Sequence, residues 1–118
     1  MKKTKDLFVY LHEVLECCDD IQSYVSGYTR TSFVADKKTQ DAVIRKIEII
    51  GEIVKRLPSV IKINAPDIPW KDIAGMRDIL IHEYASVDVN ETWVVVTSDI
   101  PKLRRNIEKL LLISGTIG

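Results

Sequence analysis

The side chains of this chain that could perform chemistry lie close together in sequence, between Arg77 and Tyr84. His82 carries an imidazole, whose unperturbed pKa of about 6.5 suits it to give or take a proton near neutral pH. Arg77 carries a permanent positive charge that could bind an anion. Asp78 precedes His82 by one helical turn and could orient the imidazole. These residues are the first candidates for a functional site.

A helix predicted from about residue 70 to residue 85 would position Arg77. At about 100° per residue, the apolar side chains of this segment gather within about 60° of Ile73, and Arg77 falls inside the same stripe. A guanidinium buried without a partner is costly. Three interpretations are therefore open. Arg77 extends past its neighbours to solvent, pairs with Glu48 or Glu52 of the preceding helix, or binds an anion.

His82 falls about 140° from Arg77 on the same helical wheel. One straight helix therefore does not bring the two side chains together. Their convergence needs a long reach by the arginine, a local distortion near Ala85, or a second copy of the chain. On the residues alone, a surface or half-buried histidine without a role is the ordinary interpretation of His82.

The rest of the chain predicts further helices. Apolar residues recur at steps of three and four in the segments 7–25, 43–57 and 100–110, which is typical of amphipathic helices. Segments 27–35 and 58–69 are predicted to be a connector and a loop. The run Trp93-Val-Val-Val96 has strand propensity, but a lone strand would lack a partner, so we expect a short helix there.

Two aspartates are predicted to begin the last helices. Asp88 precedes Glu91 by three residues and resembles a capping box, and Asp99 would cap the final helix with Pro101 in its first turn. Together these elements predict an all-α, up-and-down bundle of four to five helices, in a single domain of residues 1–118.

Composition and simple motifs exclude several classes. The chain has 17 Lys and Arg against 17 Asp and Glu, so it does not coat nucleic acid or membrane by bulk charge, although the last helix carries a basic cluster. No H-E-x-x-H, glycine-rich phosphate loop or G-x-S-x-G is present, and His12 with Glu16 is too small a set for a metal. We expect no metal and no cofactor.

The sequence shows no pattern typical of a membrane-spanning segment or a secretory signal. The longest apolar runs have four residues, which is too short to span a bilayer. Acidic residues and His12 interrupt the N-terminal segment, so this segment does not have the pattern of a secretory signal. The adjacent pair Cys17-Cys18 indicates two reduced thiols. The sequence therefore predicts a cytoplasmic protein that does not enter membranes.

The spacing Arg77-x4-His82-x-Tyr84 resembles the R-x4-H-x-Y motif of the HepT-like branch of the HEPN proteins. The likeness extends along the chain. Residues 47–58, which begin Ile-Glu-Ile-Ile-Gly-Glu, resemble the family's second helix, and residues 70–78 resemble its third. Val87-Asp88, Trp93 and Asp99-Ile-Pro101 match its C-terminal part.

The resemblance implies a HEPN-like helical bundle that dimerises and brings two motifs into one cleft. It implies the toxin of a HepT/MntA-type (type VII) toxin–antitoxin system, a metal-independent endoribonuclease with Arg77 and His82 as catalytic residues. The implied partners are a second copy, an RNA substrate and an MntA-like nucleotidyltransferase antitoxin, which transfers AMP to Tyr84.

The implied chemistry suits these residue types. RNA cleavage without a metal needs a base for the 2′-hydroxyl, an acid for the leaving 5′-oxygen and a cation for the phosphorane. One chain supplies one motif histidine, whereas a symmetric dimer supplies two, one for each proton transfer.

Two other interpretations stay open. The first is a non-catalytic helical module that binds a nucleotide or a nucleotidyltransferase, with Arg77 as a phosphate anchor; zero net charge mildly favours it. The second is a structural bundle in which Arg77 pairs with Glu48 or Glu52 and His82 has no role.

Overall fold

Three long helices form the body of the protein: α1 (Lys2–Tyr24), α3 (Lys37–Arg56) and α7 (Ile100–Ile117). The computed structural model describes the backbone of residues 2–75 and 88–117, with side chains for residues 8–75 and 88–112. Within these ranges there is no β-strand, which confirms the predicted all-α bundle. None of the helices in the described ranges is long and apolar enough to cross a membrane.

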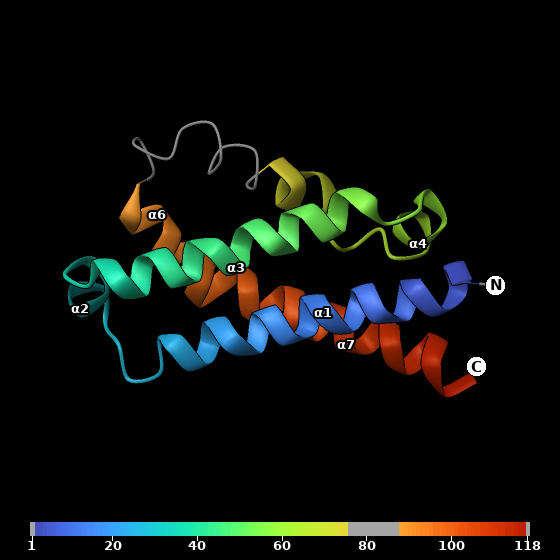
Figure 1. The fold of residues 1–118 in the computed structure, drawn as a ribbon, viewed down its shortest axis with the longest axis horizontal. Helices are drawn as coiled ribbons and strands as arrows, with labels where there is room; N and C mark the ends of the chain where they lie inside the picture. Colours follow the sequence, from blue (N-terminus) through green and yellow to red (C-terminus); the bar gives the residue numbers. More distant parts are fainter. Residues whose placement is uncertain (1, 76–87, 118) are drawn as a thin grey trace.

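The core lies where α1 packs against both α3 and α7, as Figure 1 shows. Each helix turns one apolar stripe inward at the three- and four-residue steps read from the sequence. Burial of each such side chain contributes about 1.5–3 kcal/mol before the entropy of folding is subtracted. The core side chains of these three helices include Leu11, Val14, Cys18, Ile21, Val43, Ile47, Ile50, Val54, Ile100, Leu103 and Ile107.

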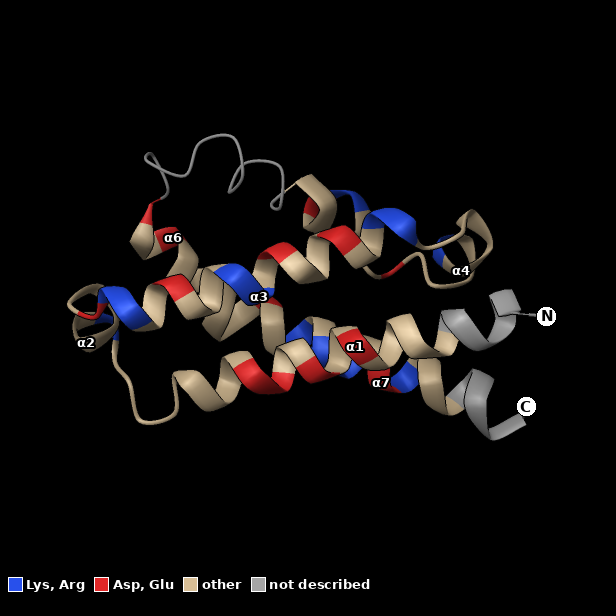
Figure 2. Ribbon diagram, in the orientation of Figure 1, with Lys and Arg blue, Asp and Glu red and all other residues tan. Residues whose placement is uncertain are grey.

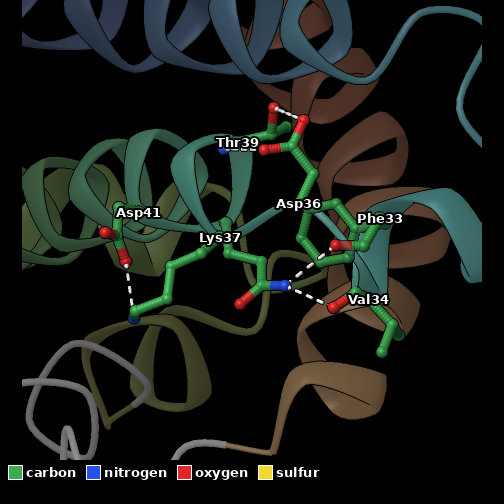
Figure 3. A network of polar contacts seen from close by, with 7 residues as sticks. Phe33, Val34, Asp36, Lys37, Thr39 and Asp41 are labelled. Carbon is green, nitrogen blue, oxygen red and sulfur yellow. Dashed lines mark hydrogen bonds and ion pairs between the residues drawn. The ribbon is translucent and has the colours of Figure 1, made fainter.

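The ends of α3 follow directly from its sequence. Asp36 is the N-cap, since its Oδ1 accepts a hydrogen bond from the Thr39 backbone N–H at 3.1 Å, and Figure 3 shows these two residues beside each other. The helix ends at Arg56, with Leu57 as its C-cap before Pro58. Proline disfavours helical conformation in the residue before it, which explains this stop. The cap and the proline therefore fix both ends of α3.

Two segments predicted to lack helices contain short ones. Residues 27–35 include α2 (Arg30–Val34), whose N-cap Thr29 forms a reciprocal capping box with Ser32. The segment 58–69 contains α4 (Ser59–Asn64), which begins directly after Pro58. The predictions of a connector and a loop were wrong there. A serine at the third position of the capping box is unusual, and α4 is too short to show an apolar period.

The prediction that Asp99 begins a new helix was also wrong. Helix α6 (Val89–Val94) continues through a π-helical turn, η2 (Val95–Asp99), directly into α7. Pro101 cannot donate a backbone hydrogen bond, and its ring conflicts with the carbonyl four residues earlier, at Thr97. The wider turn lies at this point, so it accommodates the proline without breaking the helix. The short helix predicted at Trp93–Val96 is confirmed as helical.

Candidate functional site

Four of the predicted site residues, Arg77, Asp78, His82 and Tyr84, lie outside the described residues. The structure describes the segments that lead into and out of this stretch. Residues 70–75 are helical, and Asp88 begins α6. These two segments fix the ends of the stretch that carries the motif.

Residues 70–75, which lead into the motif, are anchored in the core. Trp70 and Ile73 are buried, as the predicted apolar stripe requires. The Trp70 indole Nε1–H donates to the Ala65 carbonyl oxygen at 2.9 Å, and the Ile73 backbone N–H donates to the Pro69 carbonyl at 3.0 Å. Burial of the indole together with its hydrogen bond holds the start of this helix in one orientation. Arg77 follows Ile73 by four residues in the sequence.

The segment that follows the motif, from Asp88 onward, is fixed by a helix cap and by packing. Asp88 Oδ1 accepts from the backbone N–H groups of Asn90, at 2.9 Å, and of Glu91, at 3.4 Å, which confirms Asp88 as the predicted N-cap. Helix α6 then packs on α2, where the rings of Phe33 and Trp93 are 5.2 Å apart between centroids. The predicted cap therefore holds the chain at the point where the motif segment ends.

Glu48 and Glu52, the candidate partners of Arg77, are half-buried on α3. Glu48 Oε1 lies 3.4 Å from Nη1 of Arg45, one turn earlier on the same helix. A pairing of either carboxylate with Arg77 stays a prediction.

A cavity of about 140 Å³ lies between α3, residues 69–73 and the first half of α7. Its apolar wall includes Ile47, Ile50 and Ile73, and polar side chains stand at its rim. This cavity cannot be predicted from local patterns, because its walls come from three segments that are far apart in the sequence. The one signal in the sequence is a mixed polar and apolar face at helical spacing, formed by residue 99 at the end of η2 and residues 102, 103 and 106 of α7.

The remaining reactive side chains do not form a second site. His12 is exposed on α1, whereas Cys17 and Cys18 are buried and unpaired thiols. Burial, reinforced by the neighbouring Cys17, raises the pKa of the Cys18 thiol to about 12, so the thiolate that reacts or binds metals is not formed. Among the described residues, no three His, Cys, Asp or Glu side chains gather closely enough to hold a metal ion.

Charge on the described surface is divided between helices. Figure 2 shows acidic stretches along α1 and basic ones at the end of α3 and beside α4. Two ion pairs between helices use the acidic end of α1: Arg104 of α7 binds Asp19, and Lys46 of α3 binds Asp20 at 3.0 Å. Part of the predicted basic cluster on α7 is therefore neutralised within the fold.

Proteins similar to this chain carry ribonuclease names. A protein of Methanocaldococcus jannaschii named "Gamma-glutamylcyclotransferase and putative RNase" is 48% identical over 91% of this chain. The chain spans about half of that relative, 48% of its length. The "Probable ribonuclease HepT" of Thermococcus cleftensis is 46% identical over 86% of this chain and 92% of its own length.

No solved structure matches the chain significantly. The family model described as "Ribonuclease HepT-like", in contrast, matches residues 14–110. This range contains the whole Arg77-x4-His82-x-Tyr84 motif, both segments that anchor it and most of the three-helix core. The chain belongs to the HepT-like family of the HEPN superfamily.

Proposed function

We propose that this chain is a metal-independent endoribonuclease, and that it serves as the toxin of a type VII toxin–antitoxin pair in the cytoplasm. The observation that carries the proposal is the Arg77-x4-His82-x-Tyr84 motif inside the range matched by the ribonuclease family model. The ribonuclease names of the relatives support the same activity. Residues 1–118 would act as one domain.

The proposed roles follow from the chemistry of RNA cleavage. His82 exchanges the protons, as the base for the 2′-hydroxyl or the acid for the 5′-oxygen. Arg77 stabilises the phosphorane, whose additional charge forms only in the transition state, by charge-assisted hydrogen bonds. Asp78 orients the imidazole from one helical turn away.

The active species in this proposal is a dimer. Cleavage requires an acid and a base, and the motif of one chain holds only one histidine. A two-fold axis brings two copies of His82 to one phosphate, so that each serves in one role. Two copies of Arg77 then face the same transition state.

Tyr84 is the proposed point of control. It lies seven residues after Arg77, which corresponds to two turns along one helical face. Transfer of AMP to its hydroxyl by an MntA-like nucleotidyltransferase would add bulk and negative charge beside the arginine, and both oppose RNA entry.

The test compares wild type with His82→Ala on a broad pool of RNA in the presence of a metal chelator. We expect the wild type to cleave and the variant to lose at least about a hundredfold of the rate, because proton transfer is worth that much. Circular dichroism would confirm that both are folded. Equal cleavage by the variant would remove His82 from the mechanism.

Absence of cleavage by an unmodified wild-type dimer would contradict the enzyme proposal. The non-catalytic interpretation would then be preferred, in which Arg77 anchors a phosphate of a bound nucleotide. The zero net charge of the chain is the observation that favours this second candidate. Loss of nucleotide binding in Arg77→Ala would be its signature.

A further inference from the structure

We infer that a groove between α7 and residues 64–73 binds single-stranded RNA and holds one amino-bearing base in the cavity at its inner end. This inference rests on the proposed ribonuclease function and adds a substrate-binding surface to it. The surface consists only of described residues. It is called the α7 groove below.

The α7 groove is formed by two adjoining cavities. The first, of about 140 Å³, lies between residues 69–73, α3 and the start of α7. The second, of about 210 Å³, lies between residues 64–68 and the middle of α7. Asn106 lines both cavities and therefore stands at their junction. The two therefore meet at this residue of α7.

Helical spacing places the polar side chains of α7 in line along this surface. Lys102, Asn106 and Lys109 follow one another at steps of four and three, so they share one face of the helix. Lys102 lines the first cavity and Lys109 the second. Lys109 follows Lys102 by seven residues, which corresponds to about 10 Å along the helix axis. An extended strand of a few nucleotides matches this length.

The first cavity has the size and the walls of a site for one flat ring. An apolar cavity of about 150 Å³ in another protein accepts one benzene molecule. The cavity here, of about 140 Å³, has a wall of buried aliphatic side chains that includes Ile47, Ile50 and Leu103. Unstacked bases in single-stranded RNA are the parts of that molecule that enter such pockets.

The rim of this cavity favours bases that carry an exocyclic amino group. Asp72 and Asp99 line it, and ionised carboxylates only accept hydrogen bonds. Across the described residues, the side chains of Asp72, Asp99 and Asn106 have no hydrogen bond or ion pair that would occupy them. Exocyclic amino groups of cytosine, adenine and guanine satisfy such acceptors, whereas uracil has none to offer. The two carboxylates also repel phosphate from the cavity.

Phosphates would instead follow the two lysines. Lys102 and Lys109 are exposed, and no acidic side chain of the described chain pairs with either. The neighbouring Arg104, in contrast, is held by Asp19 and Glu108. The cations along the groove are thus the ones that remain available to the RNA backbone.

The position of the groove links it to the proposed chemistry. Asp72 and Ile73 line the first cavity and begin the segment that reaches Arg77 four residues after Ile73. A base held at Asp72 would therefore lie at the start of the segment that carries the motif in sequence. The cavity would in this way be a determinant of which nucleotides the chain binds.

The experiment measures binding and cleavage separately. Binding of fluorescein-labelled five-nucleotide RNAs, of cytidine only or uridine only, is followed by anisotropy at several salt concentrations in a His82→Ala background. Cleavage of the same sequences is followed with the motif intact. The variants are Asp99→Asn and the pair Lys102→Gln with Lys109→Gln, and the control is Lys38→Gln, an exposed lysine at the distant start of α3. The groove and control substitutions are at exposed positions, and circular dichroism verifies the fold.

The α7 groove predicts three results. The cytidine oligomer binds about tenfold more tightly than the uridine oligomer, and Asp99→Asn removes most of this preference. The double lysine variant lowers the slope of log affinity against log salt by about 0.7 for each lysine, and it raises the KM for cleavage. Lys38→Gln changes none of these values.

Other outcomes separate the groove from the proposed function. If the wild type cleaves RNA and the groove variants keep its KM, salt slope and base preference, the groove is wrong and the ribonuclease stands. If no RNA is cleaved but oligomers bind with the predicted dependence, the groove stands and the ribonuclease fails. If neither is seen, both fail. If the groove variants change only the dimer–monomer equilibrium in sedimentation, the surface is a contact between copies and the RNA groove is overturned.

Discussion

Asp19 and Asp20 are neighbours on α1, yet they bind different helices. Asp19 accepts a hydrogen bond from Nε of Arg104 on α7, and the Asp20 carboxylate lies 3.0 Å from Nζ of Lys46 on α3. Successive residues of a helix point about 100° apart, so adjacent carboxylates reach helices on two sides. One short acidic segment thus joins the three long helices outside their apolar core.

We expect the pair of Asp20 and Lys46 to contribute modestly and in a salt-dependent way. Asp20→Asn should lower the free energy of unfolding by about 0.2–1 kcal/mol, since both partners remain partly exposed. Chemical denaturation of this variant, of Lys46→Gln and of the double variant gives the coupling energy. A coupling that does not shrink in 1 M salt would contradict the electrostatic account.

Tyr28 is expected to make stability depend on pH through Asp36. Its hydroxyl donates to Asp36 Oδ2 at 2.6 Å, and this bond, with those from Thr39, lowers the pKa of Asp36 to about 2. A lowered pKa contributes stability above the unfolded value of about 3.9, and this stability is lost as the pH falls toward 2.

Tyr28→Phe should therefore lower the melting temperature at pH 6 and have less effect at pH 2. Melting curves of both proteins from pH 2 to 7 measure the difference. A destabilisation that is constant over this range would mean that packing of the ring, rather than the hydrogen bond, is what the tyrosine supplies.

Gln40 should be essential for the junction of α2 and α3. It is buried, and its Nε2 donates to the carbonyl oxygens of Phe33 and Val34 at 2.9 Å each, the two acceptors labelled in Figure 3. Gln40→Leu removes both bonds and should cost about 1–3 kcal/mol of unfolding free energy. Lys38→Ala, an exposed change in the same turn, should stay within about 0.5 kcal/mol.

Both thiols should be protected in the native protein. Cys17 and Cys18 are buried, and burial raises the pKa of each. Iodoacetamide at pH 8 should therefore label neither thiol in the folded protein and both in guanidinium, as read by intact mass. Rapid labelling of the native form would show that the end of α1 opens locally.

Tyr84→Phe should separate activity from its control. Under the proposed function, the variant retains RNA cleavage because Arg77 and His82 are unchanged. It should gain no AMP when incubated with an MntA-like nucleotidyltransferase and ATP, whereas the wild type gains the mass of AMP and loses activity. Modification of the variant would place the acceptor hydroxyl elsewhere.

The period of apolar residues predicted most of the fold, because three long amphipathic helices dominate the core. It failed where structure depends on few residues. The helix α2 is fixed by Thr29, Ser32 and the buried Phe33, and none of these has a period to detect. At Asp99, the features of a cap are real, but the helix behind it continues through η2.

The site was predicted in a different way. The types of Arg77 and His82 indicate candidates for chemistry, whereas their catalytic roles and the role of Tyr84 come from the family resemblance, and the geometry of all three stays a prediction. The groove, in contrast, was not foreseen. It depends on how residues 64–73 pack against α7, which are separated by about thirty residues of sequence and joined by no local pattern.

The π-helical turn at Val95–Asp99 determines in which direction the side chains of α7 point around the helix axis. Thr92, Val96, Ile100 and Leu103 are all buried, so the continuous helix keeps one face toward the core on both sides of the turn. Deletion of one residue within it would keep the helix continuous but rotate its C-terminal half by about 100°. Asn106 and the two lysines would then point away from residues 64–73, so the length of this one turn is constrained more strictly than its composition.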